Sequence, residues 1–345
     1  MLNRIRAYPM IVLLLPLIAA IFICNKFYPL RQPYHKTPPN ALQTQLYGRL
    51  EAAGLSGDEL ATVGALTLGY KEALTPELRH LFAASGAAHV LAVSGLHTGI
   101  IYGLLWWLLT LGGRFKPMHE DRLRRWALSL IIIGCMWSYA WLTGMTPSVV
   151  RAVLMVTIFE VGRMLYKRAF SLNTVAAAAV LILLAHPSDL WSISFQLSFA
   201  ATASIVICAP LIRYADTPAL RKTVVFPYVL GIILVSLAAQ LGTLGITVYC
   251  FKQMSVYFLL TNLIVLPLAT LLVPCGLVTV ALGGSTVGLL IGKVTHSLAW
   301  ILNHAVEWIE HLPGSTVSAQ ANGYLVALYY IILVLFFIFA TKKTN

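Results

Sequence analysis

The sequence predicts an all-α fold: a polytopic membrane helix bundle of about ten transmembrane helices, with amphipathic helices on its outer face. Hydrophobic residues make up 59% of the 345 residues, and charged residues only 10%. The mean hydropathy is +0.82. Ordinary soluble domains carry about a quarter of their residues as charged types. We therefore expect an integral membrane protein.

The predicted crossings are apolar stretches long enough for a helix to span roughly 30 Å of hydrocarbon. The first contains Pro16 and lacks a clear small-residue cleavage site, so we interpret it as a retained anchor rather than a signal peptide. The stretches lie near residues 8–30, 86–113, 126–142, 146–166, 172–185, 190–212, 224–250, 255–273, 276–292 and 322–340.

Three segments are expected along the chain. Residues 1–30 form an N-terminal transmembrane anchor, residues 31–85 an outer-face linker with amphipathic helices, and residues 86–345 a permease-type bundle. Within the middle segment, Ser56 with Glu59 has the form of a capping box, and Thr75 before Pro76 predicts another helix start. A further amphipathic stretch, residues 296–311, is expected on the same outer side.

The formal net charge of +12 is better explained by membrane orientation than by a polyanionic ligand, because Lys and Arg accumulate in cytoplasmic loops. Basic residues fall at alternate ends of successive predicted spans, which makes both termini cytoplasmic. They are Arg4, Arg6, Arg114, Lys116, Arg122, Arg124, Arg125, Arg163, Lys167, Arg168, Arg213, Arg221, Lys222, Lys342 and Lys343.

The sequence carries no pattern of a bound cofactor or metal. Its five cysteines fall singly in different spans, without the paired spacing of a disulfide framework or a zinc site. No P-loop is found, so we expect no ATPase within this chain. We predict neither a cofactor nor a metal.

The stretch AHVLAVSGLHTGI, residues 88–100, places His89, Ser94 and His97 within or beside an apolar span. Ionisable groups at membrane depth are by default functional candidates, because burying them is costly. The Ser-Gly pair could also interrupt the helix, which is tolerated only under protein cover or beside a water-filled cavity. The stripe Gly95, Gly99 and Gly103 predicts close packing of another helix.

Further polar groups occur in four later spans. Arg151 lies one turn inside a helix that is expected to start at Thr146 and Pro147, near the outer membrane surface. Glu160 is expected to pair with Arg163. Gln196, Gln240 and Asn262 each suit a hydrogen bond between helices. Collected together, these groups would form a hydrated path that suits a polyanion better than a metal cation.

Four motifs, in this order, resemble the competence domain of the ComEC family, inner-membrane proteins that pass single-stranded DNA into the bacterial cytoplasm during transformation. They are GAAHVLAVSGLHTGI at 86–100, TGMTPSVVRAVLM at 143–155, HPSDLWSISFQLSF at 186–199 and AAQLGTLGITVYCFKQMSVYFLLTNLIVLPL at 238–268. The resemblance covers roughly residues 60–315. It implies that His89, Ser94, His97, Arg151, Gln196 and Gln240 occupy characteristic core positions of the family.

The resemblance also implies partners. Larger members carry an OB-like and a metallo-β-lactamase-like domain, and neither pattern is found in this sequence. We therefore expect no nuclease activity here, and separate DNA-receptor, nuclease and cytoplasmic motor proteins working with this chain. Single-stranded DNA and membrane lipid are the expected ligands. The sequence leaves open whether one chain surrounds the strand or two chains form a homodimer.

Two other functions remain open at this stage. An intramembrane hydrolase would use Ser94 as nucleophile and His97 or His89 as base, within about 2.6–3.2 Å of each other. No carboxylate lies near them in sequence to orient the imidazole. A small-solute or lipid carrier is also compatible, because a helix bundle alone does not specify its cargo.

Overall fold

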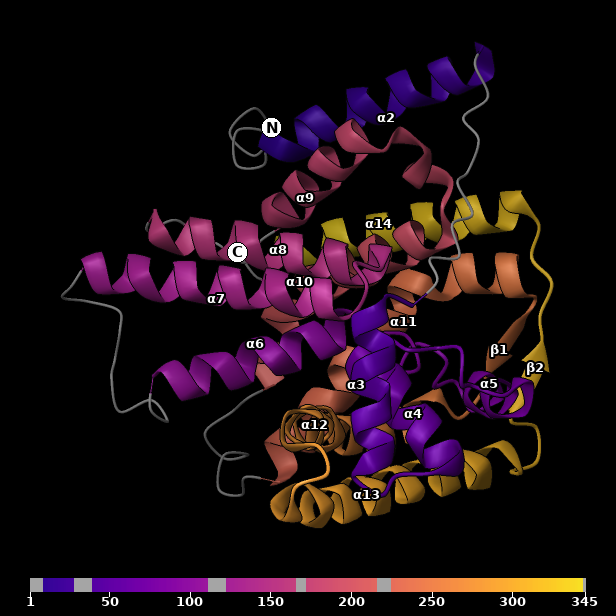
Figure 1. The fold of residues 1–345 in the computed structure, drawn as a ribbon. Helices are drawn as coiled ribbons and strands as arrows, with labels where there is room; N and C mark the ends of the chain where they lie inside the picture. The colour runs from indigo at the N-terminus through magenta and orange to yellow at the C-terminus, as the bar shows by residue number, and fades with distance from the viewer. Residues whose placement is uncertain (1–8, 28–38, 111–121, 166–171, 216–224, 344–345) are drawn as a thin grey trace.

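A computed structural model describes residues 9–27, 39–110, 122–165, 172–215 and 225–343 (Figure 1). The helices are α2 (Pro9–Phe27), α3 (Ala41–Ala52), α4 (Gly57–Leu68), α5 (Pro76–Ala84), α6 (Gly95–Leu109), α7 (Arg122–Leu142), α8 (Pro147–Met164), α9 (Leu172–Ala185), the short 3₁₀ helix η1 (Pro187–Trp191), α10 (Ile193–Ala215), α11 (Val225–Phe251), α12 (Phe258–Leu282), α13 (Thr286–Glu310) and α14 (Gly323–Lys343). Strands β1 (Gln253–Ser255) and β2 (Thr316–Ser318) form one antiparallel pair.

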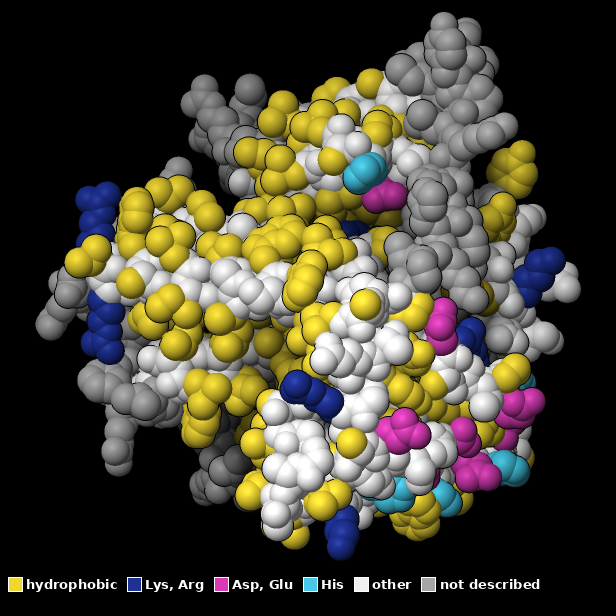
Figure 2. Space-filling view, viewed as in Figure 1, with side chains coloured by type: hydrophobic (Ala, Val, Ile, Leu, Met, Phe, Trp, Pro, Cys, Tyr) yellow, Lys and Arg dark blue, Asp and Glu magenta, His cyan; other side chains and the backbone are white. Residues whose placement is uncertain are grey.

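The all-α class is confirmed, whereas about ten crossings are not. Among the described residues, 4 helices are long and apolar enough to cross a membrane: Arg122–Leu142, Ile193–Pro210, Phe226–Phe251 and Phe258–Leu282. Shorter apolar helices cover Gly95–Leu109, Leu172–Ala185 and Gly323–Leu333. Figure 2 shows hydrophobic side chains over α7 and α8, whereas acidic side chains gather over α4, α5 and α13.

The predicted span at 86–113 begins too early, because α6 starts only at Gly95. Residues 85–94 are not helical. Gly86 has a φ of +91°, which an L-residue rarely adopts and which ends α5. Ala87, Val90 and Val93 are buried in the main core, so this irregular segment is covered by protein on one side. The interruption considered at Ser94 and Gly95 is where the helix begins.

The predicted span at 276–292 is also wrong, because one helix ends and another begins inside it. Helix α12 continues to Leu282, Gly283 has a φ of +54°, and the Ser285 side chain accepts a hydrogen bond from the Gly288 amide at 3.1 Å. That cap starts α13. The buried residues of α13 recur every three or four positions, so its second half has the amphipathic pattern expected at 296–311, and its place on the outer side stays a prediction.

Helices are present before residue 85 as expected, but α4 is not amphipathic. Thr75 caps α5 by accepting from the Leu78 amide at 3.1 Å, as Thr75 and Pro76 predict. Ser56 occupies the N-cap of α4 without a side-chain capping bond. Residues 60–68 of α4 are buried without interruption, because α3, α12 and α13 pack around this helix. An apolar helix enclosed on all sides has no polar face.

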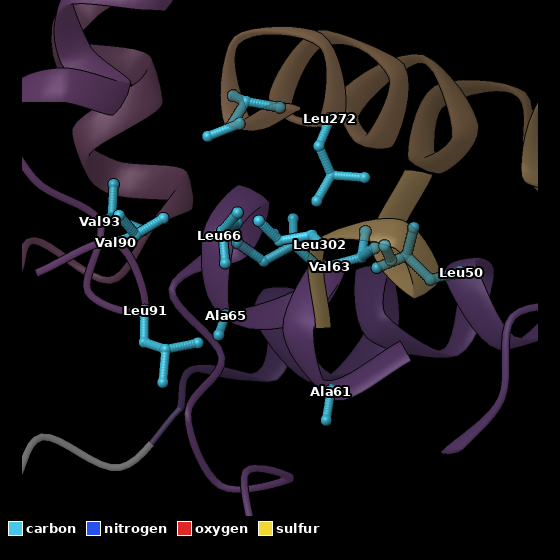
Figure 3. Packing of buried hydrophobic residues seen from close by; sticks show 14 of the residues in the cluster. Leu50, Ala61, Val63, Ala65, Leu66, Val90, Leu91, Val93, Leu272 and Leu302 are labelled. Carbon is cyan, nitrogen blue, oxygen red and sulfur yellow. The ribbon is translucent and has the colours of Figure 1, made fainter. Parts of the chain in front are cut away.

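The main hydrophobic core is built around α4 (Figure 3). Leu50 of α3, Leu272 of α12 and Leu302 of α13 meet α4 beside Val63 and Leu66, and each of these side chains is fully buried. The irregular segment joins the same core through its buried valines. The core therefore draws on residues before and after position 85, and the three-segment division stays a prediction.

Replacing Gly292 by Ala should destabilise this core. A Cβ at Gly292 would overlap the backbone carbonyl of Ala53, where α13 meets the end of α3. Overpacking of this kind costs about 1–3 kcal/mol. The matched control is Gly134→Ala in α7, where a Cβ meets open space and a helical Gly-to-Ala change gains about 0.5–1 kcal/mol. Thermal unfolding of both purified variants in detergent checks this, and equal midpoints would contradict the packing described.

Candidate functional site

Ser94 and His97 form one unit at the start of α6. Ser94 is the N-cap residue, and its backbone N–H donates to Nδ1 of His97 at 3.2 Å. The Ser94 hydroxyl lies at the same 3.2 Å from Nδ1. Because Nδ1 accepts the backbone N–H, the proton of the neutral imidazole is assigned to Nε2. His97 thus fixes the chain direction at the point where the irregular segment becomes a helix.

The two histidines of this segment have different surroundings. His97 is fully buried, and its Nε2 donates to no described residue. His89 is exposed, and its Nδ1 lies 3.1 Å from the carbonyl oxygen of Gly86. The two imidazoles are close enough to interact electrostatically. His89 therefore lies at the surface of the described chain, whereas His97 acts from within the fold.

The glycine stripe of α6 packs against no other helix among the described residues, so its predicted packing role stays a prediction. Gly95, Gly99 and Gly103 are all exposed. A Cβ built at any of them meets no atom within 4 Å. The buried side chains of α6, His97, Thr98 and Ile101, lie on its other side. The stripe is therefore an open face of bare backbone that begins where the irregular segment, residues 85–94, ends.

Arg151 is buried, with only 2% of its surface exposed. Its Nη2 donates to the backbone carbonyl of Ser194 at 3.1 Å and to the Ser194 hydroxyl at 2.6 Å. These contacts join the second and third sequence motifs, on α8 and α10. Ser194 is a site residue that the sequence did not reveal, because it lies among other serines with no pattern to single it out.

The remaining predicted polar residues lie in separate places. Gln196 donates from Nε2 to the carbonyl oxygen of Leu190 at 2.9 Å and so holds η1. Asn262 of α12 donates to the hydroxyl of Ser236 on α11 at 3.1 Å. Gln240 is a half-buried residue of α11. Gln196 and Asn262 thus each join two segments of the chain.

Glu160 is the centre of a buried network that ties α6, α7 and α8 together. The expected pair with Arg163 is confirmed, with Nη1 at 2.8 and 3.0 Å from the two carboxylate oxygens. The Tyr102 and Ser129 hydroxyls each donate to the carboxylate at 2.7 Å. The Arg163 guanidinium also lies 4.2 Å from the ring centre of Trp106. Sequence spacing indicated Arg163, but Tyr102 and Ser129 come from other helices.

The geometry gives little support to hydrolysis at Ser94. A base must take the hydroxyl proton, yet Nδ1 of His97, the nitrogen nearest that hydroxyl, already accepts the Ser94 backbone N–H. No described carboxylate makes a hydrogen bond to His97 that would orient the imidazole. Within the described parts of the chain, no group of three or more His, Cys, Asp or Glu residues is arranged to hold a metal ion.

Comparison with known proteins gives one family. The family model described as Competence protein matches residues 66–344. ComE operon protein 3 of Bacillus subtilis is 28% identical over 291 residues, covering 83% of this chain and 34% of that protein. Competence protein ComA of Neisseria gonorrhoeae is 30% identical over 160 residues, covering 45% of this chain and 22% of that protein.

A third relative, the uncharacterized protein YcaI of Escherichia coli, is 26% identical over 211 residues, covering 61% of this chain and 27% of that protein. The chain thus spans about a third or less of the length of these curated relatives. No solved structure matches.

Glu160→Gln should destabilise the bundle, because Arg163 would lose its buried counter-charge. Removing one partner of a buried ion pair costs about 3–5 kcal/mol. Glu307→Gln is the matched control, since Glu307 lies exposed on α13. Thermal unfolding in detergent compares the two, with a clear drop in midpoint expected for Glu160→Gln alone. An unfolding midpoint for Glu160→Gln that stays at the wild-type value would contradict the claim that this network stabilises the bundle.

Proposed function

The chain belongs to the competence protein family, and we propose that it forms a channel for single-stranded DNA in the bacterial inner membrane. In this proposal one strand enters the cytoplasm through the bundle during natural transformation. The names of two relatives, ComE operon protein 3 and Competence protein ComA, support this assignment. The chain covers only part of each relative, so the proposal concerns the membrane bundle alone.

The observation that carries the proposal is the open face of α6. It starts at the irregular segment, where His89 is exposed, and continues along Gly95, Gly99 and Gly103. Bare backbone leaves room for a bulky chain, and non-helical backbone at membrane depth is tolerated where it lines a water-filled cavity. We propose that the strand passes along this face. His97, on the buried side of α6, holds the start of the helix through its bond to Ser94.

Charge distribution supports the proposed direction of passage. Helix α6 ends and α7 begins at the left of Figure 1, where Arg122 and Arg124 are exposed. The acidic side chains gather at the opposite side, over α4, α5 and α13 (Figure 2). Basic residues mark the cytoplasmic side of a membrane protein. In this orientation α2 begins and α14 ends in the cytoplasm.

The strand needs cationic partners that do not read its sequence. Arg151 lies near the proposed outer end, and Arg49, Lys71 and Arg79 are exposed on the outer helices and the loop between them. Contacts between basic side chains and phosphates give binding that weakens steeply as salt rises. We expect a DNA receptor, a nuclease for the second strand and a cytoplasmic motor as partners, because single-strand uptake from a duplex requires all three actions.

The test is transformation of a naturally competent strain in which this gene is deleted. Deletion should abolish transformation, and wild-type protein should restore it. His97→Ala should fail to restore it at normal membrane levels, because the α6 start loses its Ser94–His97 bond. His304→Ala, at an exposed position of α13, is the matched control and should restore uptake.

Two outcomes would count against the channel. Full transformation by the deleted strain would remove the proposed function and favour a carrier of small solutes or lipids. Restoration by His97→Ala but not by Ser94→Ala would favour Ser94 chemistry, because the hydroxyl would then matter without its imidazole.

A further inference from the structure

We propose that Arg151, Ser194 and Asp189 form a phosphate-binding position at the outer end of the bundle. Asp189 acts there as a resident counter-charge that a phosphodiester of the passing strand replaces. The inference rests on the proposed function and adds to it the ligand chemistry and the residue that sets affinity. It is carried by the surroundings of one buried guanidinium.

The Arg151 guanidinium is held in place by neutral groups. Its two hydrogen bonds to described residues, to the carbonyl and the hydroxyl of Ser194, use the same nitrogen, Nη2. Nε is buried and donates to no described residue. The side chain is therefore fixed by α10 through Nη2, while Nε keeps a donor that no described residue uses. A charged guanidinium donor suits an oxyanion, because its hydrogen bonds to phosphate oxygens are charge-assisted.

The positive charge of Arg151 lacks a bonded carboxylate. Asp189 of η1 attracts it electrostatically. Asp189 and Arg151 are both described and form no ion pair with each other, so Asp189 acts from beyond ion-pair distance. A carbonyl and a hydroxyl do not neutralise a buried cation, which is costly at membrane depth. A phosphodiester carries one negative charge, as Asp189 does, so exchanging one for the other conserves the local charge.

The position of η1 allows such an exchange. This 3₁₀ turn of 5 residues carries Asp189, has no fully buried residue, and is held to α10 through the Gln196–Leu190 bond at 2.9 Å. Figure 2 shows a hollow between the part formed by α2 and α9 and the part formed by α8 and α10. A basic side chain lies in its depth, and an acidic and a histidine side chain lie at its rim. An anion approaching from this side meets the acidic side chain first.

The inference predicts that removing the Asp189 charge tightens DNA binding. The full chain is reconstituted in lipid nanodiscs, and binding of a fluorescent oligothymidylate is measured by anisotropy at low salt. Asp189→Asn should lower Kd by about tenfold, because one repulsive charge near the phosphate is removed. Asp58→Asn, which neutralises an exposed acidic residue of α4, is the matched control and should change Kd less than about twofold.

A double-variant cycle identifies Arg151 as the group concerned. Arg151→Gln should weaken binding, and adding Asp189→Asn to it should bring no gain. A gain of equal size in both backgrounds would overturn the proposed pairing. A thermal midpoint measured for each variant separates altered binding from altered folding.

The outcomes separate this inference from the proposed function. Binding of the oligonucleotide by the wild-type chain with no change in Asp189→Asn would overturn the phosphate position and leave the channel standing. No binding by any variant at low salt would overturn both. Weaker binding by Asp189→Asn at an unchanged thermal midpoint would make Asp189 a direct contact rather than a competitor, and would overturn the exchange.

Discussion

The packing of α4 between α3, α12 and α13 determines where the other parts of the bundle can lie. This helix is buried over nine consecutive residues, 60–68, so no aqueous passage can run beside it. The irregular segment 85–94 packs its valines into the same core. Any passage must therefore lie on the other side of that segment, where His89 and the glycines of α6 are exposed. The burial of α4 thus leaves the open face of α6 as the candidate position for a passage.

Polar contacts then fix the helices that surround this face. Glu160 ties α6 to α7 and α8, Arg151 ties α8 to α10, and Asn262 ties α12 to α11. Each contact joins a different set of helices, so no single polar residue stabilises the whole bundle. In an apolar solvent the hydrophobic effect contributes little between helices, and hydrogen bonds and close packing take a larger share of their association. The buried polar groups named here are therefore explained first by the hydrogen bonds that they make between helices.

Sequence reasoning succeeded where the signal is local. The all-α class, the starts of α5 and α8, the amphipathic half of α13 and the Glu160–Arg163 pair follow from spacings within one turn or one helix. It failed where contacts from distant segments decide. The burial of α4, the non-helical stretch before Gly95 and the partners Ser194, Tyr102 and Ser129 all depend on other helices. The glycine stripe had a pattern typical of packing, yet its neighbour is missing from the described chain.

If the bundle is a DNA channel, the glycine face of α6 meets water and the DNA strand. The most direct measurement is the reaction rate of a single cysteine at Gly99 with a charged, water-soluble thiol reagent, in a chain whose five native cysteines are replaced. Leu130→Cys, on the exposed apolar side of α7, gives the rate at a lipid-facing position. We predict that Gly99→Cys reacts much faster than Leu130→Cys and that single-stranded DNA slows it. Equal, slow rates at both positions would contradict a water-filled passage along α6.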